Sequence, residues 1–304
     1  MMPVSLQRSA FVKQIRHDQL DVLHIQHPRL QAAIALQGAQ LLRFQPHDDS
    51  NWFWLSEQAQ YRQQQSVRGG IPICWPWFGA LDKNHSAVRK QLNADAVAPA
   101  HGFVRQQPFI LTRLHEACDH LELTLSWQGH YSGWQGNARL DVTFTLRASE
   151  FSITLTTHNL GSKPLAISQA LHSYFPTRHI RHTHVHGLSQ TTYIDTLRQW
   201  QRYDAQSIVS FHTETDRIYQ TDGDDMPTLM LQTPEHGYAL HSQNSRSLVL
   251  WNPWISKAQR LSQFAPHAWQ HMVCLETGQV ADDYRQLAAG EHSSLTLRIT
   301  RRAV

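Results

Sequence analysis

The sequence has few cysteines, no long apolar run and no recognisable export signal. Its 304 residues include three cysteines, Cys74, Cys118 and Cys274, and none of them forms a C-x-x-C pair. Three scattered thiols are too few for a disulfide framework and favour a reducing compartment. No stretch of about 18 uncharged apolar residues indicates a membrane helix, and the N-terminal segment has no apolar core behind a basic start. We therefore expect a cytoplasmic protein that is not exported.

Neither sign of charge is present in large excess. The net charge is +3, charged residues make up 17% of the chain, and Lys and Arg do not gather in basic runs. This pattern argues against a nucleic-acid or membrane partner, whereas a small anionic substrate needs only a few well-placed arginines. Hydrophobic residues make up 41% of the chain, which is enough for a sizeable core. We expect the chain to fold alone, as a monomer.

Apolar and polar residues alternate along several segments, as they do in strands with one buried face. The clearest segments are 121–127, 140–146 and 151–155, which short turn-like segments separate. We expect these three to be consecutive antiparallel strands. Segments 20–25 and 295–299 predict further strands near the two ends of the chain.

Helical periodicity is rare, so the predicted fold class is all-β. Segment 51–61 is the one candidate for a short helix. No linker-like composition and no repeat divides the chain, which favours a single domain over residues 1–304. His182, His184 and His186 alternate and would share one face of a strand. A metal could bind there, although scattered surface histidines are the commoner explanation.

Two glycine-containing segments have compositions that suggest a binding site. In segment 68–79, two prolines and three glycines predict an ordered loop. Its aromatic residues are Trp75, Trp77 and Phe78. They either wall a sugar site or bury the loop, and composition alone favours neither alternative. Segment 101–105 places His101 and Arg105 on either side of a glycine, and Arg suits a phosphate because its planar fork donates two parallel hydrogen bonds. Taken alone, a surface Arg and a hydrogen-bonded loop His are more common.

Two titratable residues lie in apolar surroundings further along the chain. His172 lies in ALHSYF and Glu276 in MVCLETG. A lone His in such a segment is more often a satisfied core residue, but burial of a carboxylate is costly without a partner. Together they could supply the donor and the acceptor of an acid/base pair. Asp195 could bind hydroxyl groups or make a local turn bond, and the segment WNPW, residues 251–254, favours packing.

Six segments in this order resemble the hexose-6-phosphate mutarotases, or glucose-6-phosphate 1-epimerases, of the galactose-mutarotase-like superfamily: RGGIPICWPWFG, HGFVR, ALHSYF, GLSQTTYID, LVLWNPW and CLETG. The resemblance covers essentially the whole chain and implies a large antiparallel β supersandwich, a sugar phosphate as partner, and no metal or cofactor. It implies that His172 and Glu276 are catalytic. It also implies four substrate-binding residues: Arg68, His101, Arg105 and Asp195.

The chemistry of mutarotation agrees with this resemblance. The C1 hydroxyl loses a proton while the ring oxygen gains one, and the open aldehyde rotates before the ring closes. We expect Glu276 to be the base and protonated His172 the acid, with the arginines orienting the 6-phosphate. One departure concerns Ala100, where some relatives carry Gln, and it leaves the identity of the sugar open. The alternatives are a free-sugar aldose 1-epimerase, a non-catalytic carbohydrate-binding or sensor protein and, least of all, a glycoside hydrolase.

Overall fold

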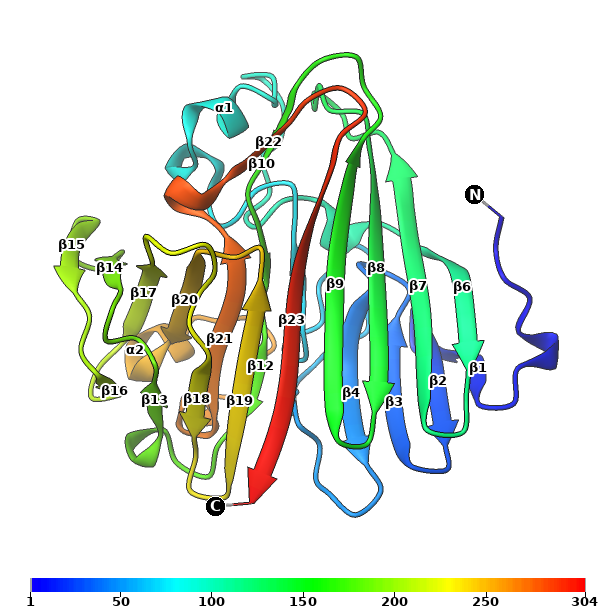
Figure 1. Cartoon of the computed structure of the whole chain (residues 1–304), viewed down its shortest axis with the longest axis horizontal. Helices are drawn as coiled ribbons and strands as arrows, with labels where there is room; N and C mark the ends of the chain where they lie inside the picture. The colour runs from blue at the N-terminus through cyan, green and yellow to red at the C-terminus, as the bar shows by residue number, and fades with distance from the viewer. Residues whose placement is uncertain (1, 304) are drawn as a thin grey trace.

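The computed structural model describes residues 2–303, and its largest element is a twisted antiparallel sheet that forms one layer of the molecule (Figure 1). Neighbouring strands of this nine-stranded sheet follow the order β16 (Ile208–Ser210), β13 (His184–His186), β18 (Leu229–Gln232), β19 (His236–Gln243), β23 (His292–Ala303), β9 (Glu150–Asn159), β8 (Ala138–Arg147), β7 (His120–Gly129) and β6 (Ile110–Glu116).

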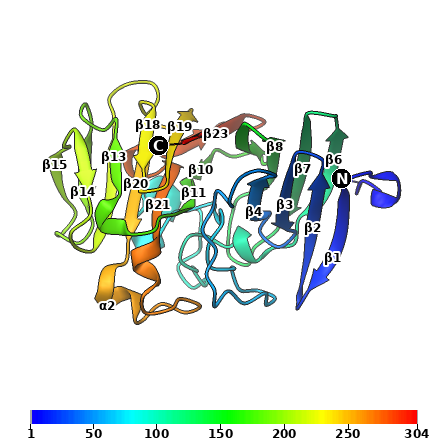
Figure 2. The same cartoon turned by 90° about the horizontal axis from the view of Figure 1, so that it is seen from below.

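Two smaller sheets form the second layer, side by side (Figure 2). The four-stranded sheet contains β1 (Val12–His17), β2 (Leu20–His27), β3 (Leu30–Ala35) and β4 (Gln40–Pro46). The eight-stranded sheet has the order β15 (Gln201–Asp204), β14 (Thr192–Asp195), β17 (Thr215–Gln220), β20 (Ser247–Asn252), β21 (Met272–Gln279), β11 (Gln169–Leu171) and β5 (Ile73–Cys74), with β12 (Tyr174–Pro176) also paired to β21.

Other elements in the described part of the chain are short. Strands β10 (Leu165–Ile167) and β22 (Arg285–Leu287) pair with each other, and the α-helices are α1 (Ser86–Arg89) and α2 (Trp254–Ala258). The 3-10 turns are η1 (Leu6–Arg8), η2 (Leu81–Lys83), η3 (Val104–Gln106), η4 (Ile180–His182), η5 (Ala268–His271) and η6 (Ala281–Asp283). Over residues 2–303, every helix is too short or too polar to cross a membrane.

Alternating burial explains the long central strands. Strands β8 and β9 alternate between buried and partly exposed residues along their whole length. They pair with antiparallel register, as do β7 and β8, so the three predicted central strands are confirmed. The strands predicted over 20–25 and 295–299 are confirmed as β2 and β23. Each fully buried Leu, Ile or Phe contributes about 2 kcal/mol to the free energy of folding.

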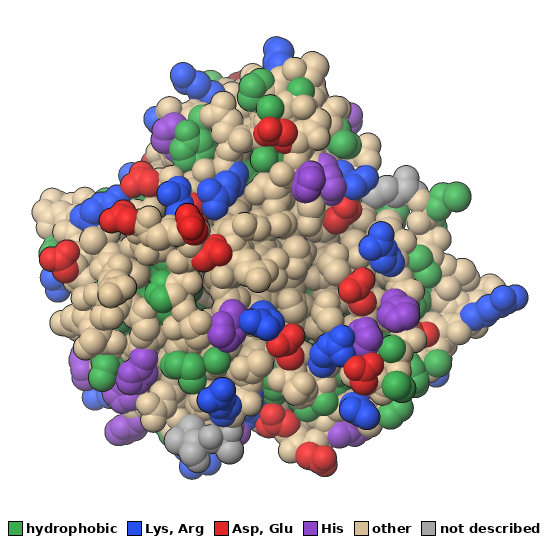
Figure 3. Space-filling model, viewed as in Figure 1, with side chains coloured by type: hydrophobic (Ala, Val, Ile, Leu, Met, Phe, Trp, Pro, Cys, Tyr) green, Lys and Arg blue, Asp and Glu red, His purple; other side chains and the backbone are tan. Residues whose placement is uncertain are grey.

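Aromatic side chains join the two layers. Phe44 of β4 lies 5.3 Å from Phe151 of β9, and Phe175 of β12 lies 5.2 Å from Tyr238 of β19, measured between ring centroids. Both smaller sheets therefore pack on the inner face of the nine-stranded sheet. On the outer face of that sheet, positive and negative side chains are interspersed (Figure 3).

Two expectations about local structure were wrong. Segment 51–61 is not a helix, because its backbone groups bond to distant segments: Trp54 N–H donates to Tyr174 O at 2.9 Å, and Ser56 N–H to Arg68 O at 3.0 Å. Burial of its aromatic residues in the core fixes this extended path. His182, His184 and His186 do not share one strand face, since His182 belongs to η4 and only the other two lie in β13.

Candidate active site

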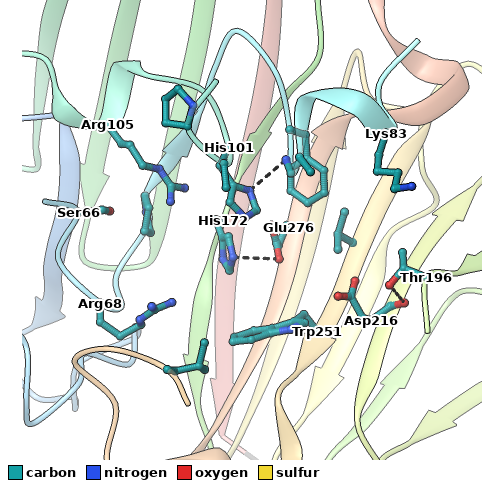
Figure 4. Close-up of a pocket in the computed structure, with 18 of the residues that line it drawn as sticks. Ser66, Arg68, Lys83, His101, Arg105, His172, Thr196, Asp216, Trp251 and Glu276 are labelled. Carbon is teal, nitrogen blue, oxygen red and sulfur yellow. Dashed lines mark hydrogen bonds and ion pairs between the residues drawn. The ribbon is translucent and has the colours of Figure 1, made fainter. Parts of the chain in front are cut away.

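The eight-stranded sheet carries a cavity of about 790 Å³ on its face away from the nine-stranded sheet (Figure 4). Alternation along β21 explains this placement: Leu275 faces the main core, so its neighbour Glu276 faces the cavity. The surrounding loops close the sides. Five of the six site residues expected from the sequence line this one cavity: Arg68, His101, Arg105, His172 and Glu276.

His172 and Glu276 face each other at the floor of the cavity. His172 lies between β11 and β12, both of which pair with β21, so this short break holds its imidazole against that strand. The distance from His172 Nε2 to Glu276 Oε1 is 3.4 Å. The His172 ring stacks on Tyr174, with centroids 4.8 Å apart, and meets the edge of Trp251. Neighbouring rings therefore fix the orientation of the imidazole before any ligand binds.

Burial determines where the proton of this pair resides. Glu276 is 1% exposed, and burial, followed by the charge of Asp216, raises its pKa well above the ordinary value. Burial also lowers the pKa of His172, and the positive charges of Arg105 and Arg68 act in the same direction. A 3.4 Å contact suits either charge state, but both shifts favour the uncharged pair, with the proton on Glu276. The expected protonated His172 therefore requires a change in its surroundings.

Two arginines lie on one side of this pair (Figure 4). Arg68 Nη1 donates to the Tyr174 hydroxyl at 3.4 Å, and Arg105 Nη2 donates to Cys74 Sγ at 3.1 Å. Arg105 Nε is buried and has no hydrogen-bond partner among the described residues. A guanidinium with an unused buried donor suits an anionic ligand, because an unpaired polar group is costly to bury.

His101 approaches the pair from a strained loop. His101 and Gly102 have φ angles of 64° and 75°, and a Cβ atom at Gly102 would lie 1.9 Å from Trp75 O. Burial and the charge of Arg105 lower the pKa of His101, which keeps the ring neutral. Its Nδ1 accepts from Gly79 N–H at 3.3 Å, so the ring hydrogen is on Nε2, where it can be donated to a ligand.

The acidic residue at the far side of the cavity is Asp216, whereas Asp195 does not line the cavity. Asp195 pairs in register with Arg217, and its carboxylate lies 3.8 Å from that side chain. Asp216, one residue earlier on β17, consequently points to the opposite face. Its Oδ2 lies 3.5 Å from Lys257 Nζ, and burial raises its pKa.

Sequence reasoning also missed an aromatic wall. Trp251 lines the cavity, although the segment WNPW favoured packing alone, while Trp254 does pack on Trp269 with centroids 4.4 Å apart. Of the three aromatics in segment 68–79, Phe78 lines the cavity, whereas Trp75 and Trp77 are buried in the core. The loop therefore contributes one aromatic residue to the cavity wall and two to the core.

One group in the described residues has the side chains of a metal site. Ligand atoms of His172, Cys274 and Glu276 lie within 4.8 Å of one another, and these are residue types that bind Zn²⁺. Burial raises the pKa of the Cys274 thiol well above its usual value, and Zn²⁺ binds the thiolate. This burial favours a protonated thiol beside the acid/base pair.

Comparison with known proteins agrees with this geometry. The family model described as aldose 1-epimerase matches residues 21–300. The chain belongs to the aldose 1-epimerase family. Within this family it is similar to a protein of Escherichia coli (strain K12) provisionally named glucose-6-phosphate 1-epimerase, at 27% identity over 99% of this chain and 98% of the relative. A relative of the same provisional name from Salmonella typhimurium is 28% identical over 91% of this chain and 89% of its own length.

Solved structures of other proteins share the fold. The crystal structure of a protein from Salmonella typhimurium, provisionally described as a mutarotase, superposes with a TM-score of 0.86 at 26% identity, covering 99% of this chain and 97% of that one. A galactose mutarotase-related enzyme from Lactobacillus acidophilus, at 14% identity, has a TM-score of 0.72 over 93% of this chain and 97% of its own. The expected all-β, galactose-mutarotase-like fold is therefore confirmed. As an aldose 1-epimerase family member, the protein is an epimerase.

Proposed function

We propose that this epimerase interconverts the α and β anomers of a hexose 6-phosphate, with glucose 6-phosphate the first substrate to test. The observation that carries the proposal is the meeting, in one cavity, of a buried acid/base pair with two arginines. The pair suits proton transfer at a hemiacetal, and Arg105 keeps a buried donor for an anion. Similarity to relatives that carry the provisional name glucose-6-phosphate 1-epimerase supports the same substrate class.

In this proposal the substrate phosphate also prepares the acid. Arg68 and Arg105 lower the pKa of His172, and a phosphate dianion beside them offsets their charge. The pKa of His172 then rises, and the proton passes from Glu276 to His172 across their 3.4 Å contact. The bound substrate therefore produces the charged pair that ring opening needs.

Ring opening then proceeds with balanced protons. The Glu276 carboxylate takes the proton of the C1 hydroxyl, the bond from C1 to the ring oxygen breaks, and His172 protonates that oxygen. Rotation about the bond from C1 to C2 presents the other face of the aldehyde. On closure, neutral His172 takes the proton back while Glu276 returns its proton to O1, giving the other anomer. His101 Nε2–H and Asp216 hold hydroxyl groups of the sugar.

The test is anomer exchange of glucose 6-phosphate followed by NMR. We expect the wild type to accelerate exchange, and His172→Ala and Glu276→Gln to lower it by about 10²- to 10⁴-fold while remaining folded by circular dichroism. Glucose and galactose serve as unphosphorylated controls. Acceleration of the free sugars alone would refute the role of the arginines. Binding of sugars without any exchange would indicate a sensor or binding protein.

We also propose a cytoplasmic location and a monomeric state. Cys74, Cys118 and Cys274 carry free thiols, and two of these thiols are buried, which suits a reducing compartment. Cell fractionation tests the location, and light scattering of the purified protein tests the mass in solution. Detection in the exported fraction, or twice the chain mass, would contradict the respective proposal.

A further inference from the structure

An exposed tryptophan stands at the mouth of the cavity. Trp200 lines the cavity and is 38% exposed, whereas Trp75 and Trp77 are at most 1% exposed. Its neighbours Leu197 and Gln199 are exposed as well but do not line the cavity. What distinguishes this ring from other exposed apolar side chains is its place in the wall of the cavity, where it can contact a bound ligand.

The backbone at Trp200 is strained. Trp200 and Gln199 are the central residues of a turn that closes when Gln201 N–H donates to Arg198 O at 3.1 Å. Their φ angles are 60° and 55°, in the left-handed region that favours glycine and asparagine. A bulky residue held in this region indicates that its side chain contributes something the turn itself does not need.

The position of the turn relates Trp200 to the rest of the site. The loop begins at Thr196, whose N–H donates to Asp216 O at 3.0 Å, and Thr196 Oγ1 donates to the same oxygen. Thr196 and Asp216 lie on the far side of Glu276 from Arg68 and Arg105 (Figure 4). The turn therefore carries Trp200 at the end of the cavity opposite the two arginines.

We propose that Trp200 is a sugar-stacking residue, which packs its ring against the apolar C–H face of the pyranose and covers the Asp216 end of the cavity. The inference rests on the proposed function, because a phosphate held by the arginines directs the ring towards this end. An aromatic ring supplies a large apolar contact area with few torsions to fix, which suits the apolar face of a sugar. The indole N–H suits the hydroxyl rim. Ring contact of this kind strengthens binding without moving protons.

Three variants separate ring contact from backbone strain. Trp200→Gly removes both, Gln199→Gly removes the same strain from the adjacent residue outside the cavity, and Trp200→Phe keeps an aromatic ring. Anomer exchange by NMR gives KM and kcat, and thermal unfolding gives Tm. We expect Gln199→Gly to raise Tm by about 2 °C with unchanged KM, because glycine adopts a positive φ freely. Trp200→Gly should raise KM roughly 3- to 10-fold with little change in kcat.

Rescue by the aromatic variant completes the test. Trp200→Phe should keep KM within about twofold of the wild type. A KM in Trp200→Gly equal to that of Gln199→Gly would overturn the inference, as would an equal loss in kcat. The wild type tests the proposed function separately from the stacking role of Trp200. If the wild type exchanges free hexoses but not the phosphate ester, the same variants are compared on glucose. A wild type that exchanges neither overturns both proposals.

Discussion

Replacement of Arg105 by Met should separate phosphorylated from free sugars. The Met side chain occupies a similar volume but removes the charge and the unpaired Nε donor. A hydrogen bond to a charged group contributes about 1.5 to 3 kcal/mol. At about 1.4 kcal/mol per factor of ten, kcat/KM for glucose 6-phosphate should fall roughly 10- to 150-fold. For free glucose, which offers Arg105 no phosphate, kcat/KM should not fall.

The pH dependence gives a second readout of the same variant. Arg105 is one of the charges that lower the pKa of His172 in the unliganded site, and of His101. Without Arg105, both pKa values should rise. In the pH profile of kcat/KM for glucose, one limb reports the titration of histidine, and this limb should move to higher pH. Arg113→Met on exposed β6 is the matched control. Equal losses for both sugars, with an unmoved limb, would refute a phosphate-binding Arg105.

Three further changes test the buried parts of the site. Glu276→Gln should raise Tm at neutral pH while it lowers exchange as described above. The folded pKa of Glu276 lies well above its ordinary value of 4.5, so the wild type loses stability as pH rises from about 4.5 to the folded pKa, and a Tm difference independent of pH would contradict this. Cys274→Ser should keep most activity in the NMR assay, because the thiol is protonated and moves no proton; a folded but inactive variant would show otherwise. Gly102→Ala should lower the free energy of unfolding by about 2 kcal/mol or more in denaturant titrations, since its Cβ would collide with Trp75 O, and an unchanged midpoint would argue against that loop geometry.

Local sequence patterns predicted the central strands but not the orientation of every site residue. Strands β7, β8 and β9 were predictable because each buries one face, and the apolar residues of that face alternate within the segment itself. Asp195 and Asp216 are equally polar and lie on adjacent strands, and only the register of β14 with β17 determines which of them faces the cavity. Register depends on pairing partners distant in sequence, which no local pattern contains.

Segment 51–61 illustrates the same limit for secondary structure. Its backbone bonds to Arg68 and Tyr174 outweigh local helix preference. His172 and Glu276 were identifiable because polar groups in apolar segments are unusual, and their 3.4 Å contact follows from the pairing of β11 and β12 with β21. Trp200 gave no such signal, because its importance depends on a φ angle and on a cavity that form only in the folded chain.

The site is assembled from segments that are far apart in the chain, so it forms late in folding. Arg68 and Glu276 line the same cavity, yet they meet only after β5, β11 and β21 have joined in one sheet. Long-range pairing of this kind forms slowly during folding. After dilution from denaturant, enzymatic activity should therefore recover later than the circular dichroism signal of the strands. Activity then reports the last stage of refolding.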